Sequence, residues 1–160
     1  MIVFETRIKE LVAQLPQIDG FENHFYWGNS GQELNKYLAV ESQPYPLIYL
    51  TSGYESSQGD FKEVSRNCTF IIAVREKELD LLNISRLEKS YKTYLNPLAD
   101  YFIQLLDSSS ISRLRNGYKL RRIPNYSEAN ENSQIDLWDV IELQCEVVLN
   151  SNCLKPYTWE

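Results

Sequence analysis

The sequence predicts an α+β fold: a mostly antiparallel sheet with an N-terminal helix and a long second helix packed on one face, plus an extra β-hairpin. Apolar residues recur at helical spacing in two segments, short apolar runs typical of strands lie between and after them, and an Asn-Gly pair separates two strand-like runs. The 160 residues are expected to form a single domain, 1–160, with a C-terminal tail at about 151–160.

The first quarter of the chain predicts a helix and a strand. Residues 2–15 place apolar side chains three and four apart with charges between them, which indicates an amphipathic helix that ends at Pro16. The segment FENHFYW at 21–27 alternates two sets of side chains and predicts an aromatic strand. Residues 29–45 show neither pattern, so we interpret them as an irregular excursion.

Two very apolar runs follow, separated by a polar segment. LIYLTSG, entered through Pro44 and Pro46, predicts an extended strand. CTFIIAV at 68–74 is apolar on both alternating faces. This pattern is typical of a central strand that is covered on both sides, or that is covered on one side by helices and on the other by a neighbouring subunit. The polar segment 51–67 is then predicted to be a long hairpin loop. No part of the order of elements indicates a parallel crossover.

The longest predicted helix spans 81–106, where apolar residues again step by three and four. Pro97 lies inside it, so we expect either a kink or two abutting helices with Pro97 in the first turn of the second. Asn116 and Gly117 are the strongest short hairpin signal in the chain. A polar loop is predicted at 124–135.

Residues that carry catalysis or bind metals or cofactors do not form a recognisable motif. His24 is the only histidine, lies among aromatic residues, and is expected to be structural. The sequence contains neither CxxC, CxxH or HxxxH spacings nor a glycine-rich phosphate loop. We therefore expect no enzyme activity, no metal and no cofactor. An enzyme that uses Cys68 or Cys145 with His24 is the least favoured alternative, since these thiols lie in apolar runs.

Four carboxylates near the last strand, Asp136, Asp139, Glu142 and Glu146, resemble an acid/base or divalent-metal set. An alternating strand over LWDVIELQCEVVL places Asp139 on the opposite face from Glu142 and Glu146. Two glutamates four residues apart on a strand are about 13 Å apart. We therefore interpret the strand as solvated or facing an interface.

Basic residues cluster around the Asn-Gly pair, at Arg113, Arg115, Lys119, Arg121 and Arg122. Three interpretations are open: a nucleic-acid patch, a solvated hairpin, or a basic rim that meets an acidic rim on a neighbouring copy. The net charge of −6 argues against nucleic-acid binding. The candidate subunit interface comprises Glu55, Asp60, Glu63, Arg115, Lys119, Arg121, Arg122, Glu128 and Glu131.

The N-terminal segment has no signal-peptide pattern, and the apolar runs are far shorter than the roughly 18 residues that span a bilayer. We therefore expect a cytosolic chain without a membrane partner.

The order and texture of these elements resemble the tail terminator and tail-completion (neck) proteins of tailed bacteriophages. The resemblance covers about residues 2–150 and rests on the N-terminal helix, the PLIYL strand, the polar hairpin loop, the FIIAV strand, the helix YLNPLADYFIQLL and the terminal strand. It implies a virion structural protein, assembled in the host cytoplasm, that forms a homo-oligomeric ring, typically a hexamer, at the phage neck or tail end. Its partners would be itself and other neck or tail-tube proteins.

In such a ring, loops 51–67 and 124–135 would contact neighbours. DNA would pass through an acidic lumen without specific binding, because like charges repel. The Asn116-Gly117 hairpin and the tail with Tyr157 and Trp159 have no counterpart in the resemblance. The alternative is a small cytosolic protein-binding domain without catalytic activity, which would hold a peptide or protein at the aromatic segment 21–27.

Overall fold

The computed structural model describes residues 2–28, 31–40, 44–51, 55–58, 62–75, 82–124, 126 and 138–159, and the side chains of most of them. In chain order the elements are α1 (Phe4–Val12), β1 (His24–Gly28), α2 (Gly31–Val40), β2 (Leu47–Thr51), β3 (Glu55–Gln58), β4 (Glu63–Arg75), α3 (Asn83–Arg86), η1 (Leu87–Leu95), α4 (Asn96–Ser108), β5 (Ser112–Ile123) and β6 (Trp138–Asn150). The predicted α+β class is confirmed.

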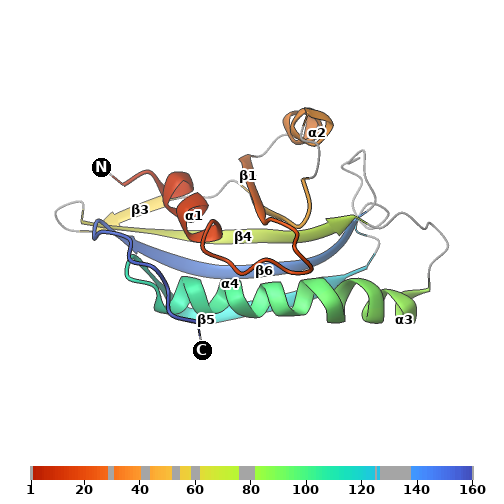
Figure 1. Ribbon diagram of the computed structural model, residues 1–160. Helices are drawn as coiled ribbons and strands as arrows, with labels where there is room; N and C mark the ends of the chain where they lie inside the picture. Colours follow the sequence, from red (N-terminus) through yellow and green to blue (C-terminus); the bar gives the residue numbers. More distant parts are fainter. Residues whose placement is uncertain are drawn as a thin grey trace.

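The described strands form one six-stranded sheet in the order β1-β2-β4-β6-β5, and β3 pairs with the first part of β4 (Figure 1). All neighbouring pairs are antiparallel except β1 and β2, which are parallel. Parallel neighbours require a crossover connection, and α2 lies within it. The expectations of an irregular excursion at 29–45 and of no parallel crossover were therefore wrong.

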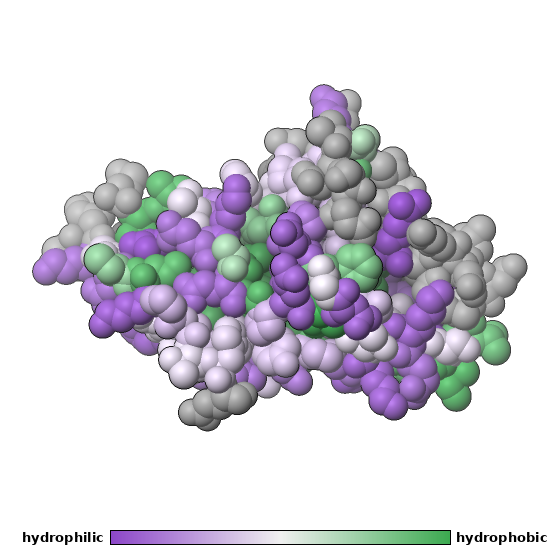
Figure 2. Space-filling view, in the orientation of Figure 1, coloured by the Kyte–Doolittle hydropathy of each residue, from purple (hydrophilic) through white to green (hydrophobic). Residues whose placement is uncertain are grey.

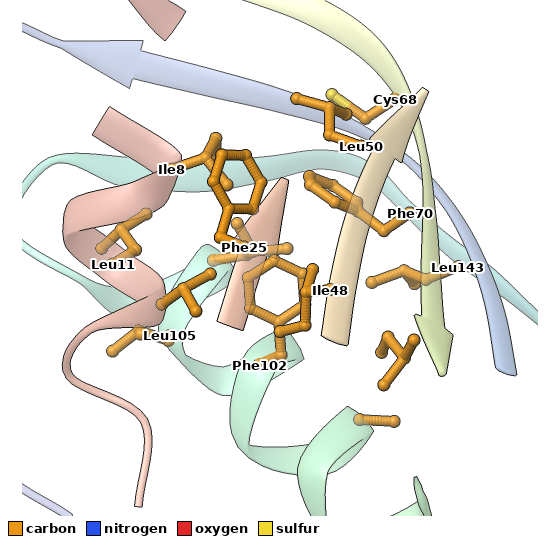
Figure 3. Close-up of a cluster of buried hydrophobic side chains, with 14 of the residues drawn as sticks. Ile8, Leu11, Phe25, Ile48, Leu50, Cys68, Phe70, Phe102, Leu105 and Leu143 are labelled. Carbon is orange, nitrogen blue, oxygen red and sulfur yellow. The ribbon is translucent and has the colours of Figure 1, made fainter. Parts of the chain in front are cut away.

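The main hydrophobic core lies between one face of the sheet and the helices α1, η1 and α4, and we call this side the helical face. Figure 3 shows Ile8 of α1 and Phe102 of α4 directed toward Phe25 and Phe70 of the strands. The rings of Phe70 and Phe102 meet edge to face, with centroids 5.0 Å apart. Figure 1 shows the long helix running alongside β6 and β5, so the predicted packing on one face is confirmed.

A smaller core lies on the opposite face of the sheet, at the β2 end. Leu34 and Leu38 of α2 pack there with Tyr49 of β2 and Trp138 of β6. The indole Nε1 of Trp138 donates a hydrogen bond of 2.6 Å to the hydroxyl of Tyr45. The prediction that the FIIAV strand is covered on both sides is confirmed at this end, since Ile71 belongs to the smaller core.

The long helix changes its hydrogen bonding at Pro97. Residues 87–95 form a π-helix, whose last turn is closed by a bond from the N–H of Asn96 to the carbonyl of Tyr91. From Asn96 the chain continues as an α-helix with Pro97 in its first turn. Since proline has no N–H to donate and its ring crowds the preceding turn, the wider π turn precedes it. The expectation of two abutting helices with Pro97 in the first turn of the second is confirmed.

Most of the polar segment 51–67 belongs to the sheet. Residues 55–58 pair as β3 with residues 63–66 of β4, and residues 59–61 between them lie outside the described residues. The long hairpin loop predicted from polarity was wrong. Polarity did not reveal these strands because two of their polar residues, Ser65 and Arg66, are buried, and Arg66 pairs with Glu5 of α1 at 2.8 Å.

Asn116 and Gly117 do not form a hairpin. Arg115 pairs with Glu146 and Tyr118 with Cys145, so both sides of the Asn-Gly pair continue along β6 within the single strand β5. The two intervening residues have φ values of 64° and 76° and form a bulge. The sequence therefore signalled the left-handed backbone but not its context, because such residues suit a bulge as well as a turn.

The C-terminal tail packs on the helical face. The ring of Trp159 meets that of Tyr101 of α4 at 5.3 Å, and the N–H of Tyr157 donates to the side-chain oxygen of Gln14 at 2.8 Å. The tail thus lies against both the N-terminal segment and α4, and it covers part of the core.

Candidate functional site: the open face and the outer strands of the sheet

The face of the sheet opposite α1 and α4 carries polar side chains over β4, β6 and β5, and we call this region the open face. Three rows cross it: Asn67, Glu146 and Arg115; Thr69, Gln144 and Lys119; and Ile71, Glu142 and Arg121. Among the described helices, α2 packs only at the β2 end of this face. Asn67, Gln144, Lys119 and Arg121 are exposed.

Ion pairs within the chain hold three of the basic residues of β5. Arg115 pairs with Glu146 at 3.1 Å and Arg121 with Glu142 at 3.3 Å, in both cases directly across the two strands. Arg113 pairs with Glu63 of β4 at 3.1 Å. Partly exposed pairs of this kind contribute about 0–1 kcal/mol each, so they orient the side chains more than they stabilise the fold.

The other residues predicted for the subunit interface lie in several different places. Lys119 is exposed on the open face and forms no ion pair with the described residues. Arg122 points to the helical face, where its Nε donates to Asn96 Oδ1 at 3.2 Å. Glu55 lies in β3 opposite Arg66, but its side chain is outside the described set. Asp60, Glu128 and Glu131 also lie outside the described residues.

The carboxylates of β6 make different contacts on its two faces. Glu142 and Glu146 lie on the open face, and Asp139 is on the helical face, as predicted. Asp139 is fully buried and pairs with Arg86 of α3 at 2.6 Å, while the hydroxyl of Ser90 donates to it at 2.7 Å. Asp136 lies outside the described residues. Asp139, Glu142 and Glu146 therefore serve separate contacts and do not form one metal or acid/base set.

Sequence reasoning missed both the buried pair and the role of the glutamates. Arg86 resembled any surface charge of a helix, because helical periodicity gives no sign that its turn lies against the end of β6. The one available signal was Asp139 between Trp138 and Val140, a charge within an apolar run. A buried charge requires a partner, so this signal called for a buried cation.

The two thiols considered for catalysis lie inside the sheet. Cys68 and Cys145 are buried opposite each other on β4 and β6. Burial raises the pKa of the Cys145 thiol to about 12 and raises the pKa of the Cys68 thiol further, with the neighbouring Cys145 adding to the effect. Neither thiol is therefore a nucleophile near neutral pH. Across the described chain, His, Cys, Asp and Glu side chains form no cluster of three or more suited to a metal ion.

Exposed apolar side chains distinguish the outer strands from the inner ones. Trp27 of β1 is 46% exposed, and Tyr118 and Leu120 of β5 are 51% and 44% exposed. The other large exposed apolar side chains in the described part lie outside strands, at Val3, Phe21, Leu82, Ile84 and Leu87. Figure 2 shows hydrophobic surface at the end of the molecule where Figure 1 places α3. The two outer strands of the sheet path thus carry apolar surface that the inner strands bury.

A cavity of about 250 Å³ lies beside β5 on the helical face, between α4 and the sheet. It is lined by Asn96, Ala99, Asp100, Leu120, Arg122 and Ile141. An apolar floor with a guanidinium and a carboxylate at the rim suits an amphipathic side chain better than a small charged ligand.

No known family model matches the chain, and no curated protein matches it either. The helices in the part of the chain that the structure describes are too short or too polar to span a membrane.

Proposed function

We propose that the chain is a virion structural protein without catalytic activity. It would be a subunit of a homo-oligomeric ring, a hexamer, at the neck or tail end of a tailed bacteriophage. The observation that carries this proposal is the apolar surface on both outer strands of the sheet, at Trp27 on one side and at Tyr118 and Leu120 on the other. Exposed apolar surface of this kind marks sites of protein contact.

Two different contact surfaces on opposite sides of a subunit favour a ring. When one surface binds the other surface of the next copy, the contact is heterologous, and successive copies close into a ring if the rotation between them allows it. The two packed cores support this role, since they make the sheet and its helices a rigid body that fixes the angle between contacts.

DNA is proposed to pass through the ring without specific binding. Arg113, Arg115 and Arg121 form ion pairs within the chain, so phosphates would have to compete with carboxylates that are already in place. The net charge of −6 adds a general repulsion. Other neck or tail-tube proteins are the proposed axial partners, and the virion and the host cytoplasm are the proposed locations.

Negative-stain electron microscopy of the purified chain, combined with sedimentation velocity over a range of concentrations, tests the proposal. We expect closed rings with a central opening and a sedimenting species several times heavier than the 18.7 kDa chain. Duplex DNA added at physiological salt should not co-sediment. A chain that stays monomeric at all concentrations, or that binds DNA tightly with a steep dependence on salt, would contradict the proposal.

A second candidate function is a small binding domain that holds a peptide at 21–27. The exposure of Phe21, at 39%, and of Trp27 favours it. Such a domain would remain a monomer or dimer, so the same sedimentation measurement separates the two candidates.

A further inference from the structure

The directions of the strands determine how two copies can pair through their outer strands. β1 runs parallel to β2, and each later step along the order β2-β4-β6-β5 reverses direction, so β5 runs opposite to β1. If a second copy is placed in the same orientation beside the first, β5 of one faces β1 of the other in an antiparallel arrangement. Antiparallel pairing satisfies backbone N–H and C=O groups along both strands.

We propose that β5 of one copy pairs with β1 of the next copy, and that Trp27 of that second copy occupies the cavity beside Leu120. The inference rests on the proposed ring and specifies its contact: the occupant of the β5 edge is a second copy of this chain. The partner strand meets the segment of β5 that follows the bulge at Asn116 and Gly117, from Tyr118 to Ile123.

The side chains of the two strands match face by face. Trp27 lies on the helical face, since it is paired with Leu50 of the main core and stacks on Phe25 at 6.0 Å. Tyr118 and Leu120 lie on the helical face too, because their register partners are Cys145 and Leu143. Residues paired across antiparallel strands share a face. Extending the sheet from copy to copy therefore brings the exposed apolar side chains of both edges together.

The cavity has the chemistry that an indole requires. Leu120, Ala99 and Ile141 supply apolar contacts, and the guanidinium of Arg122 lies at the rim, where it can stack on an aromatic ring. Asp100 and Asn96 offer oxygen acceptors for the indole N–H. Tryptophan, tyrosine and arginine are enriched among the residues that contribute most to binding at protein interfaces.

Charges near the two edges are complementary. Lys119 is exposed on β5 and Arg121 is already paired with Glu142, while the chain just before β1 carries the exposed acidic residues Asp19 and Glu22, of which Asp19 accepts a hydrogen bond of 3.0 Å from Tyr94 of η1. An antiparallel partner strand places the start of β1 toward the end of β5. Glu22 of one copy thus lies toward the end of β5 of the next copy, where Arg121 and Arg122 stand, so the two edges carry opposite charges.

A mixing experiment with two variants tests the contact. Leu120→Asp disables the β5 edge and leaves β1 intact, while Trp27→Ala disables the β1 edge and leaves β5 intact. Each variant alone should lose the ring, with apparent affinity between copies reduced about tenfold or more, which corresponds to about 1.4 kcal/mol. A mixture of the two should form a dimer of one copy of each, because one intact β5 edge and one intact β1 edge remain. Sedimentation velocity measures the size of the assembly in all three samples.

Matched controls keep the result interpretable. Leu82→Asp places the same charge on an apolar residue that is 71% exposed but lies outside the sheet, and Val3→Ala truncates another exposed apolar side chain. Both controls should form rings like the wild type. Circular dichroism and thermal unfolding verify that Trp27→Ala still folds. Leu120→Asp changes an exposed strand position, so it tests the contact even if Trp27→Ala does not fold.

The outcomes separate this inference from the proposed function. If the wild type forms rings and both variants still do, the contact is wrong and the ring proposal stands. Loss of rings in the Leu82→Asp control would also overturn the contact, because ring assembly would then depend on a surface outside the two outer strands. If the wild type forms no assembly at any concentration, both the ring proposal and the contact are overturned.

Discussion

The two faces of β6 differ in what their side chains touch. On the helical face, Ile141, Leu143 and Leu149 are buried against the helices and the neighbouring strands. On the open face, Glu142 and Glu146 form ion pairs with arginines of β5 that remain partly exposed. One strand therefore serves two purposes: its helical face specifies the fold, and its open face orients charges at the surface.

The largest expected effect is at the buried charge on the helical face. Asp139→Ala leaves Arg86 buried without its carboxylate, and the free energy of unfolding should fall by about 3–5 kcal/mol. Urea unfolding measures it. Replacing both residues together, with Arg86→Met and Asp139→Leu, should cost less than the single change. A single change that costs no more than a surface substitution would show that the pair is not buried as described.

Neighbouring residues on opposite faces give the most direct contrast. Leu143→Ala removes a fully buried side chain and should lower the free energy of unfolding by about 2–5 kcal/mol. Gln144→Ala, one residue further on and exposed, should change it by no more than about 0.5 kcal/mol. Chemical denaturation of both variants measures the difference. An equal loss of unfolding free energy in the two variants would contradict the claim that only the helical face of β6 stabilises the fold.

The buried thiols predict a loss of stability at alkaline pH. Burial raises the pKa of Cys145 to about 12 in the folded state, whereas an unfolded thiol titrates near 8.5. The folded state therefore binds the proton more tightly, so its stability falls as pH rises above about 8.5, by at most about 1.4 kcal/mol per pH unit for one thiol. Unfolding curves at several alkaline pH values should show a smaller fall for Cys145→Ala. An identical pH dependence would contradict the burial.

The smallest expected effects are at the open-face ion pairs. Glu142→Gln and Glu146→Gln should each lower the free energy of unfolding by less than about 1 kcal/mol, because these pairs are partly solvated and screened by salt. Thermal unfolding at low and high salt measures the change. The difference from wild type should shrink at high salt, and a large effect that does not depend on salt would indicate a buried pair instead.

The parts of the fold that were predictable share a long, one-sided pattern. The two amphipathic helices and the last strand each place apolar residues on one face over many residues. The face that this periodicity predicts to be buried is the face that packs in the core. Helix α2 was missed because Leu34 and Leu38 supply only one helical step beside residues of mixed character. The parallel pairing of β1 and β2 was missed with it, because the crossover depends on that helix.

For the candidate site, the sequence indicated which basic residues take part but not which residues they contact. The basic residues of β5 were identified, but partners on a neighbouring copy were expected, whereas the structure places Glu142 and Glu146 beside Arg121 and Arg115. Register decides this pairing, and the bulge at Asn116 and Gly117 sets the register. A sequence that reads as a hairpin there cannot reveal which glutamate lies opposite which arginine.

Amide hydrogen exchange on the wild-type chain and on the Leu120→Asp variant tests most directly whether copies meet at the outer strands. At concentrations where the wild type is assembled, we expect its amides in β1 and in residues 118–123 to exchange more slowly than those of the variant. Amides of β4 and β6 should exchange alike in both, since these strands are paired on both sides within each copy. Equal exchange at the outer strands in an assembled wild type and a monomeric variant would contradict contact through the edges of the sheet.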